Sequence, residues 1–312
     1  MDIFNQISEY PGSGRPVLTV GMFDGVHTGH RRILDKVVQT ARQQGSPSLV
    51  VTFHPHPKLV LHKDSEVKLL HTGEERIAHF ALAGIDQLLI IPFTPEFAAL
   101  PAADFIRLIL VENLGVRTVI TGHDHAFGKD AGGNLELMNR LGKRYNFGVE
   151  QVPAFMLDGM TVSSSLIRQQ LEAGMVGSAN ALLGYPYPIT GRVVRGNQIG
   201  RLIGFPTANI QVEDNHKLIP ARGVYAALIT WEGRTFKGMS NIGIRPTINA
   251  HALTVEANIF GFDTEIYGEK ITLRLVERIR DEKKFGNLEL LKSQLFSDRK
   301  RAEQILASVN MH

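Results

Sequence analysis

Two histidines, His27 and His30, end a glycine-rich segment of ten residues that begins at Gly21. The segment follows a short apolar run and precedes apolar residues spaced as on one face of a helix, so we expect it to join a strand to a helix N-terminus. Such a terminus binds phosphate, glycines let the backbone approach closely, and two imidazoles can donate to a phosphoryl group under attack. A phosphate site is therefore one interpretation. A plain strand-to-helix turn with solvent-facing histidines is the other, and zinc is disfavoured because cysteine and an evident third ligand are absent from the sequence.

A second candidate is the run of hydroxyl residues Ser163, Ser164 and Ser165, followed by Arg168. Serine side chains favour the N-cap of a helix, and an arginine one turn later can form a bidentate contact with phosphate. The alternative is a helix cap without any further role.

A third candidate is the turn that contains Gly204, Thr207 and Asn209. Proline and asparagine favour turns, so a plain loop would also account for this segment. The stretch before it is rich in glycine and arginine, which suits a phosphate cradle. The residues concerned are Arg195, Gly196, Gly200 and Arg201.

The first half of the chain alternates between apolar runs and segments of helical periodicity. Apolar runs without strict alternation are typical of buried parallel strands, so the pattern predicts a Rossmann-like α/β domain with a doubly wound sheet. Expected strands cover residues 17–20, 49–53, 88–91, 118–121 and 149–153, and expected helices cover the stripe at 33–41 and residues 74–83, 103–113 and 136–145.

The pattern changes after residue 184. A segment rich in glycine, tyrosine and proline, 184–188, indicates a linker, and short β-type segments at close spacing follow it. The sequence therefore predicts two domains, residues 1–184 and 185–312, the second being a small antiparallel barrel or sandwich closed by a helix. Expected strands cover 189–194, 223–230, 235–240, 254–259 and 271–276.

Composition limits the function classes. The 312 residues carry a net charge of +3 without a long basic run, so nucleic-acid binding is not implied and small anionic ligands explain the excess equally well. The N-terminal ten residues do not resemble a signal peptide, and no apolar run approaches the length of a membrane span. We therefore expect a cytoplasmic protein without a membrane partner. The oligomeric state cannot be inferred from the sequence.

The segment ending at His30 resembles the HxGH signature of nucleotidyltransferases, in the longer form of the FAD synthetase branch. The serine run with Arg168 resembles the later phosphate-binding segment of that superfamily. The turn ending at Asn209 resembles the signature of riboflavin kinases, and further matches follow at 241–247, 255–256, 267–268 and 280–285. Nearly the whole chain thus resembles the bifunctional prokaryotic riboflavin kinase/FAD synthetase family, which implies a six-stranded Greek-key-like barrel with a terminal helix for the second domain.

The resemblance also implies the chemistry and the residues that perform it. The second domain would phosphorylate riboflavin to FMN with ATP and Mg²⁺, with Glu256 as general base and Thr207 and Asn209 holding the metal and phosphates. The first would adenylylate FMN to FAD with ATP and release pyrophosphate, with His27 and His30 as charge-stabilising donors. The other expected nucleotide or phosphate contacts are Gly21, Phe23, Asp24, Gly25, Asp124, Ser163, Ser164, Ser165, Arg168, Gly200 and Gly204.

Two positions depart from the family pattern: His54 stands where an acidic residue is more usual, and His125 where an aromatic is usual. These departures bear on details of the first site. Two other functions stay open at this point. One is a different HxGH transferase, such as a cytidylyl- or pantetheine-phosphate adenylyltransferase, fused to an unrelated β-domain. The other is a flavin-binding sensor or carrier, against which the intact Thr207, Asn209 and Glu256 argue.

Overall fold

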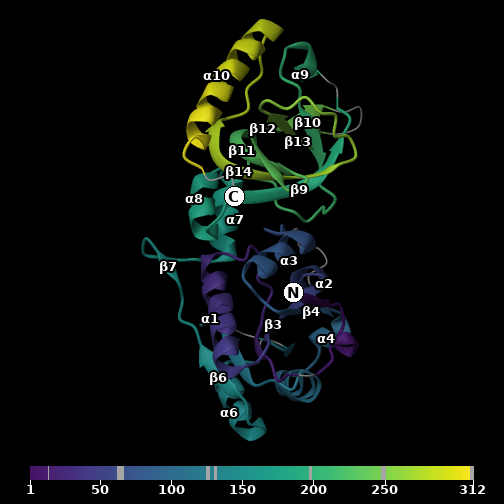
Figure 1. Cartoon of the computed structure of the whole chain (residues 1–312), viewed down its shortest axis with the longest axis vertical. Coiled ribbons are helices and arrows are strands. Elements are labelled where there is room, and N and C mark those ends of the chain that lie inside the picture. The colour runs from purple at the N-terminus through teal and green to yellow at the C-terminus, as the bar shows by residue number, and fades with distance from the viewer. Residues whose placement is uncertain are drawn as a thin grey trace. The chain divides into compact units, whose positions relative to one another are not determined.

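The computed structural model divides into two compact units, Met1–Ser164 and Ser165–His312 (Figure 1). It describes residues 1–12, 14–61, 67–123, 127–129, 132–196, 199–246 and 251–309. The expected boundary at 184/185 follows the composition, whereas this division follows packing and assigns residues 165–184 to the second unit. The placement of the domain boundary therefore stays a proposal.

A parallel sheet forms the centre of the first unit, as the apolar runs predict. Among the described residues it has six strands in the order β1-β4-β3-β2-β5-β6, and every neighbouring pair is parallel. The edge strand β1 was not expected, because its three residues carry no apolar run. The strands are β1 (Asp2–Phe4), β2 (Val17–Val20), β3 (Ser48–His54), β4 (Gln87–Pro92), β5 (Thr118–Thr121) and β6 (Gly148–Gln151).

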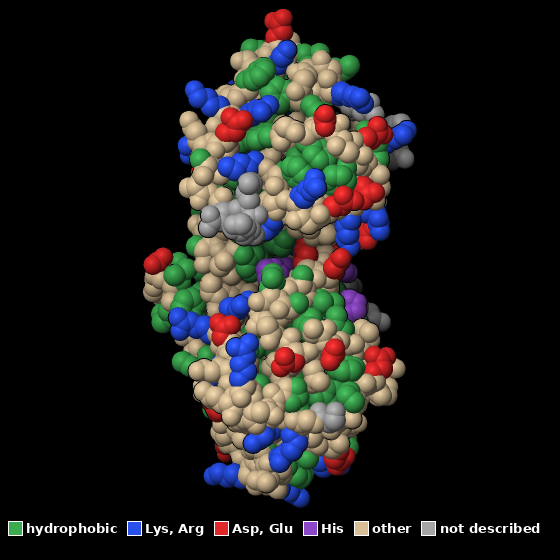
Figure 2. Space-filling model, in the orientation of Figure 1, with side chains coloured by type: hydrophobic (Ala, Val, Ile, Leu, Met, Phe, Trp, Pro, Cys, Tyr) green, Lys and Arg blue, Asp and Glu red, His purple; other side chains and the backbone are tan. Residues whose placement is uncertain are grey.

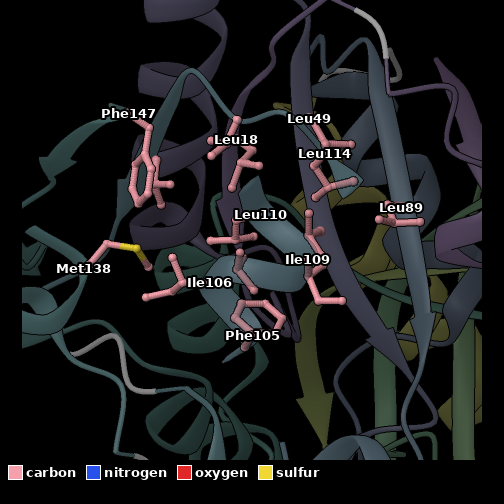
Figure 3. Packing of buried hydrophobic residues seen from close by; sticks show 14 of the residues in the cluster. Leu18, Leu49, Leu89, Phe105, Ile106, Ile109, Leu110, Leu114, Met138 and Phe147 are labelled. Atoms are coloured by element: carbon pink, nitrogen blue, oxygen red, sulfur yellow. The ribbon is translucent and has the colours of Figure 1, made fainter. Parts of the chain in front are cut away.

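Apolar side chains cover both faces of this sheet, which explains why its strands lack alternation. One face packs against α1 (Thr28–Gln44) and α3 (Gly73–Leu82). The other packs against α6 (Leu135–Tyr145) and η2 (Phe105–Asn113), a π-helical segment. Figure 3 shows Leu18 and Leu49 of the sheet in the same cluster as Ile106 and Leu110 of η2. The remaining elements of the first unit are short: η1 (Ile7–Glu9), α2 (Pro57–Leu61), α4 (Pro95–Ala98), α5 (Ala102–Asp104), β7 (Met156–Leu157) and β8 (Met160–Thr161).

A closed antiparallel barrel forms the second unit. The described residues give it six strands in the order β10-β13-β12-β11-β14-β9. The five strands expected from the sequence lie within β9, β11, β12, β13 and β14, and β10 is the sixth. Their bounds are β9 (Tyr187–Val194), β10 (Ala208–Gln211), β11 (Gly223–Trp231), β12 (Arg234–Pro246), β13 (His251–Ile259) and β14 (Lys270–Arg280).

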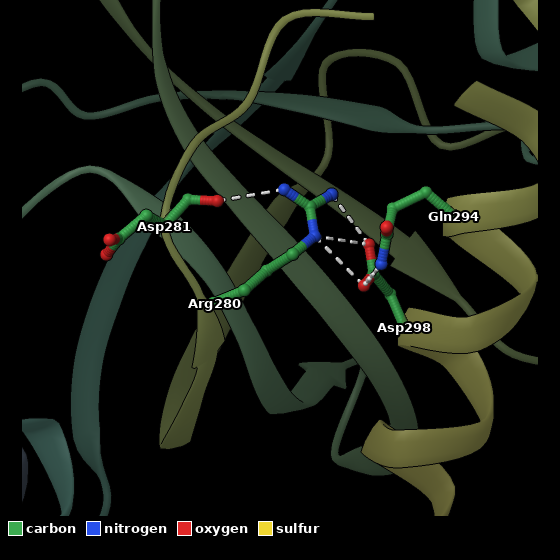
Figure 4. A network of polar contacts seen from close by, with 4 residues as sticks. All are labelled: Arg280, Asp281, Gln294 and Asp298. Carbon is green, nitrogen blue, oxygen red and sulfur yellow. Dashed lines mark hydrogen bonds and ion pairs between the residues drawn. The ribbon is translucent and has the colours of Figure 1, made fainter. Parts of the chain in front are cut away.

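The terminal helix α10 (Leu288–Leu306) lies along the outside of the barrel (Figure 1). Its residues Ala302 and Leu306 pack against apolar residues of β11 and β12. The side chain of Asp298, 1% exposed, accepts hydrogen bonds from the Arg280 guanidinium at the end of β14 (Nη2–Oδ2 2.7 Å) and from Gln294 (Figure 4). This network fixes the helix at one end of the barrel.

Three further helices belong to the second unit almost entirely. These are α7 (Ser164–Glu172), α8 (Val176–Leu183) and α9 (Ile199–Leu202). The Asn180 amide of α8 donates to the carbonyls of Leu275 (2.9 Å) and Val276 (3.0 Å) in β14, and its oxygen accepts from the amide of Tyr187 (2.8 Å). Thus α8 is hydrogen-bonded to two strands of the barrel.

The surface combines both signs of charge. On the face drawn in Figure 2, Lys and Arg side chains are interspersed with Asp and Glu. Across the described ranges, we find no helix that is both long and apolar enough to span a membrane.

Candidate functional sites

The HxGH segment lies where the strand order of the first sheet reverses. The chain runs from β2 outward through β3 to β4 and returns to β5 on the other side of β2, and ligands bind beyond the carboxyl ends of strands at such a point. Residues 21–27 leave the end of β2 and lead directly into α1. The expected strand-to-helix position of the segment is confirmed.

His27 is the N-cap residue of α1. Its Nδ1 atom accepts a hydrogen bond from the backbone N–H of His30 (3.3 Å), which leaves the Nε2 position to carry the ring proton. The two imidazole rings are stacked, with centroids 3.6 Å apart. Burial, and then the neighbouring His27 ring, lower the pKa of His30 well below its usual value. His30 is therefore a neutral ring at neutral pH.

Two glycines without side chains leave space for the rings of His27 and Phe23. A Cβ atom on Gly29 would lie 3.3 Å from the His27 ring, and one on Gly21 would lie 3.0 Å from the Phe23 ring. Phe23 is buried and its ring meets that of His30 edge-on at 5.2 Å. Gly25 has a φ of +85°, which glycine adopts without strain. The glycine spacing thus serves ring packing and the turn.

Asp24 is buried and binds backbone amides of the segment before α3. The residue is 5% exposed, and its carboxylate accepts hydrogen bonds from the backbone amides of Leu70 (3.0 and 3.1 Å) and His71 (3.1 Å). Beside it, the guanidinium of Arg76 donates to the carbonyl of Met22 (2.9 Å). Sequence reasoning missed Arg76, because a charged residue of an amphipathic helix ordinarily faces solvent.

The serine run reaches the same loop. The Ser164 hydroxyl donates to the carbonyl of Asp24 (2.8 Å), so two motifs 140 residues apart meet within the first unit. Ser163 is half-buried and Ser165 is exposed, whereas Arg168 is half-buried one turn into α7. The serine run thus contacts the HxGH segment through Ser164.

Not every residue considered from the sequence is described. Asp124 and His125 fall outside the described residues, as does Thr247 of the second domain. His54 is exposed at the end of β3, and His56 accepts a hydrogen bond from the amide of Lys58 (3.1 Å).

Three polar residues form a row across the outside of the barrel. In the strand register, Asn209 of β10 lies opposite Glu256 of β13, and Glu256 in turn lies opposite Asn241 of β12. The Thr207 hydroxyl donates to the Glu256 carboxylate at 3.4 Å, and Asn258 donates to the carbonyl of Pro206 at 2.7 Å. The predicted turn and the predicted acidic residue, 49 positions apart, are therefore adjacent.

This row lines a cavity of about 660 Å³ in the second unit. The barrel strands line it with polar residues and with apolar ones such as Met239, whereas α10 contributes Leu288, Leu291 and Leu295. Gly200 also lines it, and a Cβ there would lie 2.2 Å from the Phe205 carbonyl, so the close turn requires glycine. Gly204 is exposed with a φ of +83°. The cavity is large enough for a small organic ligand.

Several of the side chains that line this cavity carry oxygen atoms that could bind a metal ion, among them Thr207, Asn209 and Glu256. Mg²⁺ is bound through few protein oxygens together with substrate phosphates, and the hydroxyl of Thr207 beside the carboxylate of Glu256 suits that pattern. No cluster of three or more His, Cys, Asp or Glu side chains suited to a metal occurs in the part of the chain that the structure describes. The residues fit a metal that arrives with a phosphate ligand.

Comparison with known proteins finds a family match for each of the two parts of the chain. A sequence model of FAD synthetase matches residues 12–166, and one of riboflavin kinase matches residues 183–306. The chain is 35% identical over 301 residues to the bifunctional riboflavin kinase/FMN adenylyltransferase of Escherichia coli strain K12, covering 96% of this chain and 95% of that protein. It is 36% identical over 294 residues to that of Bacillus subtilis, covering 92% of each.

A solved structure is similar over the whole length. It is described as a macrolide-efflux protein from Streptococcus pneumoniae, is 29% identical, and superposes with a TM-score of 0.87 over 99% of each chain. The two matched models, the order of the two folds and the identity to curated relatives lead to one conclusion. The chain belongs to the family of bifunctional riboflavin kinases/FMN adenylyltransferases.

Proposed function

We propose that each of the two domains expected from the sequence, residues 1–184 and 185–312, carries one of the two activities of this transferase and that the residues described above perform them. The chain combines riboflavin kinase and FMN adenylyltransferase domains, so its substrates are riboflavin, FMN and ATP. The observation that carries the assignment is the meeting of distant motifs within each unit: Ser164 with the HxGH loop, and Thr207 with Glu256.

In the first domain, residues 1–184, an oxygen of the FMN phosphate attacks the α-phosphorus of ATP. The bond between that phosphorus and the bridging oxygen breaks, and pyrophosphate leaves. The nucleophile is already an anion, so a strong general base is unnecessary. His27 presents its Nε2–H, and His30 acts as a neutral donor, both toward negative charge that develops on the phosphoryl oxygens.

The polyphosphate of ATP occupies the N-terminus of α7 in this proposal. Ser163, Ser165 and Arg168 contact the β- and γ-phosphates, while Ser164 ties that terminus to the loop through the Asp24 carbonyl. Gly21, Phe23 and Gly25 shape the phosphate-facing loop. We also propose Asp124 as a contact for the nucleotide.

In the second unit, Glu256 accepts the proton of the ribityl 5′-hydroxyl as that oxygen takes the γ-phosphoryl group of ATP, and ADP leaves. Gly200 and Gly204 let the backbone approach the phosphates. Thr207 and Asn209 would hold Mg²⁺, which would neutralise part of the phosphate charge when bound. Phosphoryl transfer depends mainly on positioning and charge stabilisation, and this sparse polar row supplies both.

Two single variants test the assignment. His30→Ala should reduce conversion of FMN to FAD by about 10²–10³-fold, the typical effect of losing one charge-stabilising donor, and leave conversion of riboflavin to FMN intact. Glu256→Gln should do the reverse. Flavins separated chromatographically over time, with riboflavin or FMN supplied with ATP and Mg²⁺, give both rates. Parental FAD formation in His30→Ala would contradict the proposal for the first unit.

We further infer that the protein works in the cytoplasm, without a nucleic-acid or membrane partner, and that the two catalytic domains divide at 184/185. Both inferences rest on composition and on the absence of split motifs across residues 184–188.

A further inference from the structure

The loop that presents the two histidines has an uncommon backbone. Phe23 and Val26 have positive φ angles of +50° and +30°, in addition to Gly25 at +85°. Side chains other than glycine adopt this region at a cost in free energy, and they keep it only where the surroundings impose it. The loop therefore depends on contacts that hold it from outside.

Arg76 provides one such contact from α3. Its guanidinium donates through Nη1 to the carbonyl of Met22 in the loop (2.9 Å) and through Nη2 to the carbonyl of Phe53 near the end of β3 (3.2 Å). The residue is only 8% exposed. A planar fork thus bridges the loop and the neighbouring strand, and both carbonyls are satisfied in the protein interior.

The segment before α3 holds the loop a second time. Asp24 accepts the backbone amides of Leu70 and His71, and a capping box between Thr72 and Glu75 fixes the start of the helix that carries Arg76. Burial lowers the pKa of the Arg76 guanidinium, and the Asp24 carboxylate opposes that effect. The charge of each group therefore makes burial of the other less costly.

We infer that Arg76 is a positioning residue for adenylyl transfer. It fixes the Met22 carbonyl and, through it, the strained turn that directs His27 and His30 toward the phosphates. Asp24, two residues after Met22, holds the same turn. Its carboxylate binds backbone amides and not phosphate. This inference rests on the function proposed above for the two histidines.

Arg76→Lys in the full chain tests it. Lysine keeps the charge but has no planar fork, so it cannot reach both carbonyls. We expect the kcat of FAD formation from FMN to fall about 10- to 100-fold, because small displacements of catalytic groups have effects of that size. The KM values for ATP and FMN should change less than about twofold, and FMN formation from riboflavin should not change, since the displaced groups act in the transition state of one reaction.

Arg117→Lys is the matched control. Arg117 also belongs to the first unit and donates from its guanidinium to a backbone carbonyl, that of Gln44 (2.8 Å), but it is exposed and precedes β5 at the opposite ends of the strands. Its FAD-forming kcat should stay at the parental value. A kcat for Arg76→Lys within about twofold of this control would overturn the inference. Should Arg76→Lys fail to fold, Arg76→Gln keeps one donor and serves instead.

A double variant separates positioning from simple stability. If Arg76 acts through His30, adding Arg76→Lys to His30→Ala should lower kcat by a clearly smaller factor than it does in the parent. Equal factors in both backgrounds would overturn the inference. Parental FAD formation in His30→Ala alone would instead refute the proposed function of the histidines, so the two failures are distinguishable.

Discussion

Replacing Asp298 by alanine should destabilise the barrel unit by a measurable amount. Its carboxylate is almost fully buried and accepts three contacts from Arg280, at 3.0, 3.0 and 2.7 Å, and one from Gln294 at 2.9 Å. Removing one partner of a buried pair leaves the other charge uncompensated and costs about 3–5 kcal/mol. Because the Arg280 side chain keeps 20% exposure, solvent recovers part of this, and we expect about 3 kcal/mol.

The chain contains one tryptophan, Trp231, which lies in β11 of the barrel. Its fluorescence therefore reports unfolding of the second unit in the full-length protein. With a urea dependence of about 2 kcal/mol/M, a loss of about 3 kcal/mol lowers the midpoint by about 1.5 M. Since α10 also lines the cavity, the KM for riboflavin should rise, whereas FAD formation from supplied FMN should not change.

Glu303→Ala is the control on the same helix. Glu303 pairs with Arg299 at 2.9 Å, but both side chains are about half exposed, and such pairs contribute less than about 1 kcal/mol. Its urea midpoint should lie within about 0.5 M of the parent, by the same urea dependence. If Asp298→Ala unfolded at the midpoint of this control, the view that the buried pair anchors α10 would be refuted.

Three further outcomes are expected. The folded state keeps His30 neutral, whereas in the unfolded chain this histidine takes up a proton as the pH falls through about 6.5. Below that pH, the free energy of unfolding should therefore decrease by at most about 1.4 kcal/mol for each pH unit. In His30→Gln this decrease should be smaller, as measured by circular dichroism during urea unfolding at several pH values. Arg168→Lys should raise the ATP concentration required for FAD formation, and an unchanged requirement would return Arg168 to a structural residue. Asn258→Ala removes the donor to the Pro206 carbonyl, so the KM for ATP in FMN formation should rise severalfold, measured by coupled ADP release.

The arrangement of the first unit was largely predictable from the sequence. Strands at 17–20 and 118–121 match β2 and β5 at both ends, because buried parallel strands form uninterrupted apolar runs. The helix after the HxGH segment was equally clear from its spacing. The expected helix at 103–113 is instead a short α-turn followed by the π-helical η2, a difference in backbone hydrogen bonding that apolar spacing does not reveal.

Contacts that depend on tertiary structure were not predictable. Strand β10 carries Asn209 but follows Pro206 in a segment of turn-forming residues, and only its pairing with β13 and β9 makes it a strand. Likewise, nothing in the sequence distinguishes Arg76 from a solvated helix residue. The orientation of the Asp24 carboxylate depends on hydrogen bonds from the amides of Leu70 and His71, which are 46 and 47 positions away in the sequence.

The domain boundary leads to the last prediction. A fragment of residues 185–312 contains the whole polar row and the cavity, so it should convert riboflavin to FMN and make no FAD. It lacks α8, however, and with it the Asn180 hydrogen bonds and the burial of Leu182 and Leu183.

A fragment of residues 165–312 keeps these contacts and should be more stable by roughly 3 kcal/mol or more, the value of burying two leucines. Urea unfolding followed by Trp231 compares the two fragments directly. Equal urea midpoints would mean that α8 does not stabilise the barrel. That result would favour the boundary at 184/185. A shorter fragment that folds and binds riboflavin but never phosphorylates it would show that the kinase site needs residues before 185.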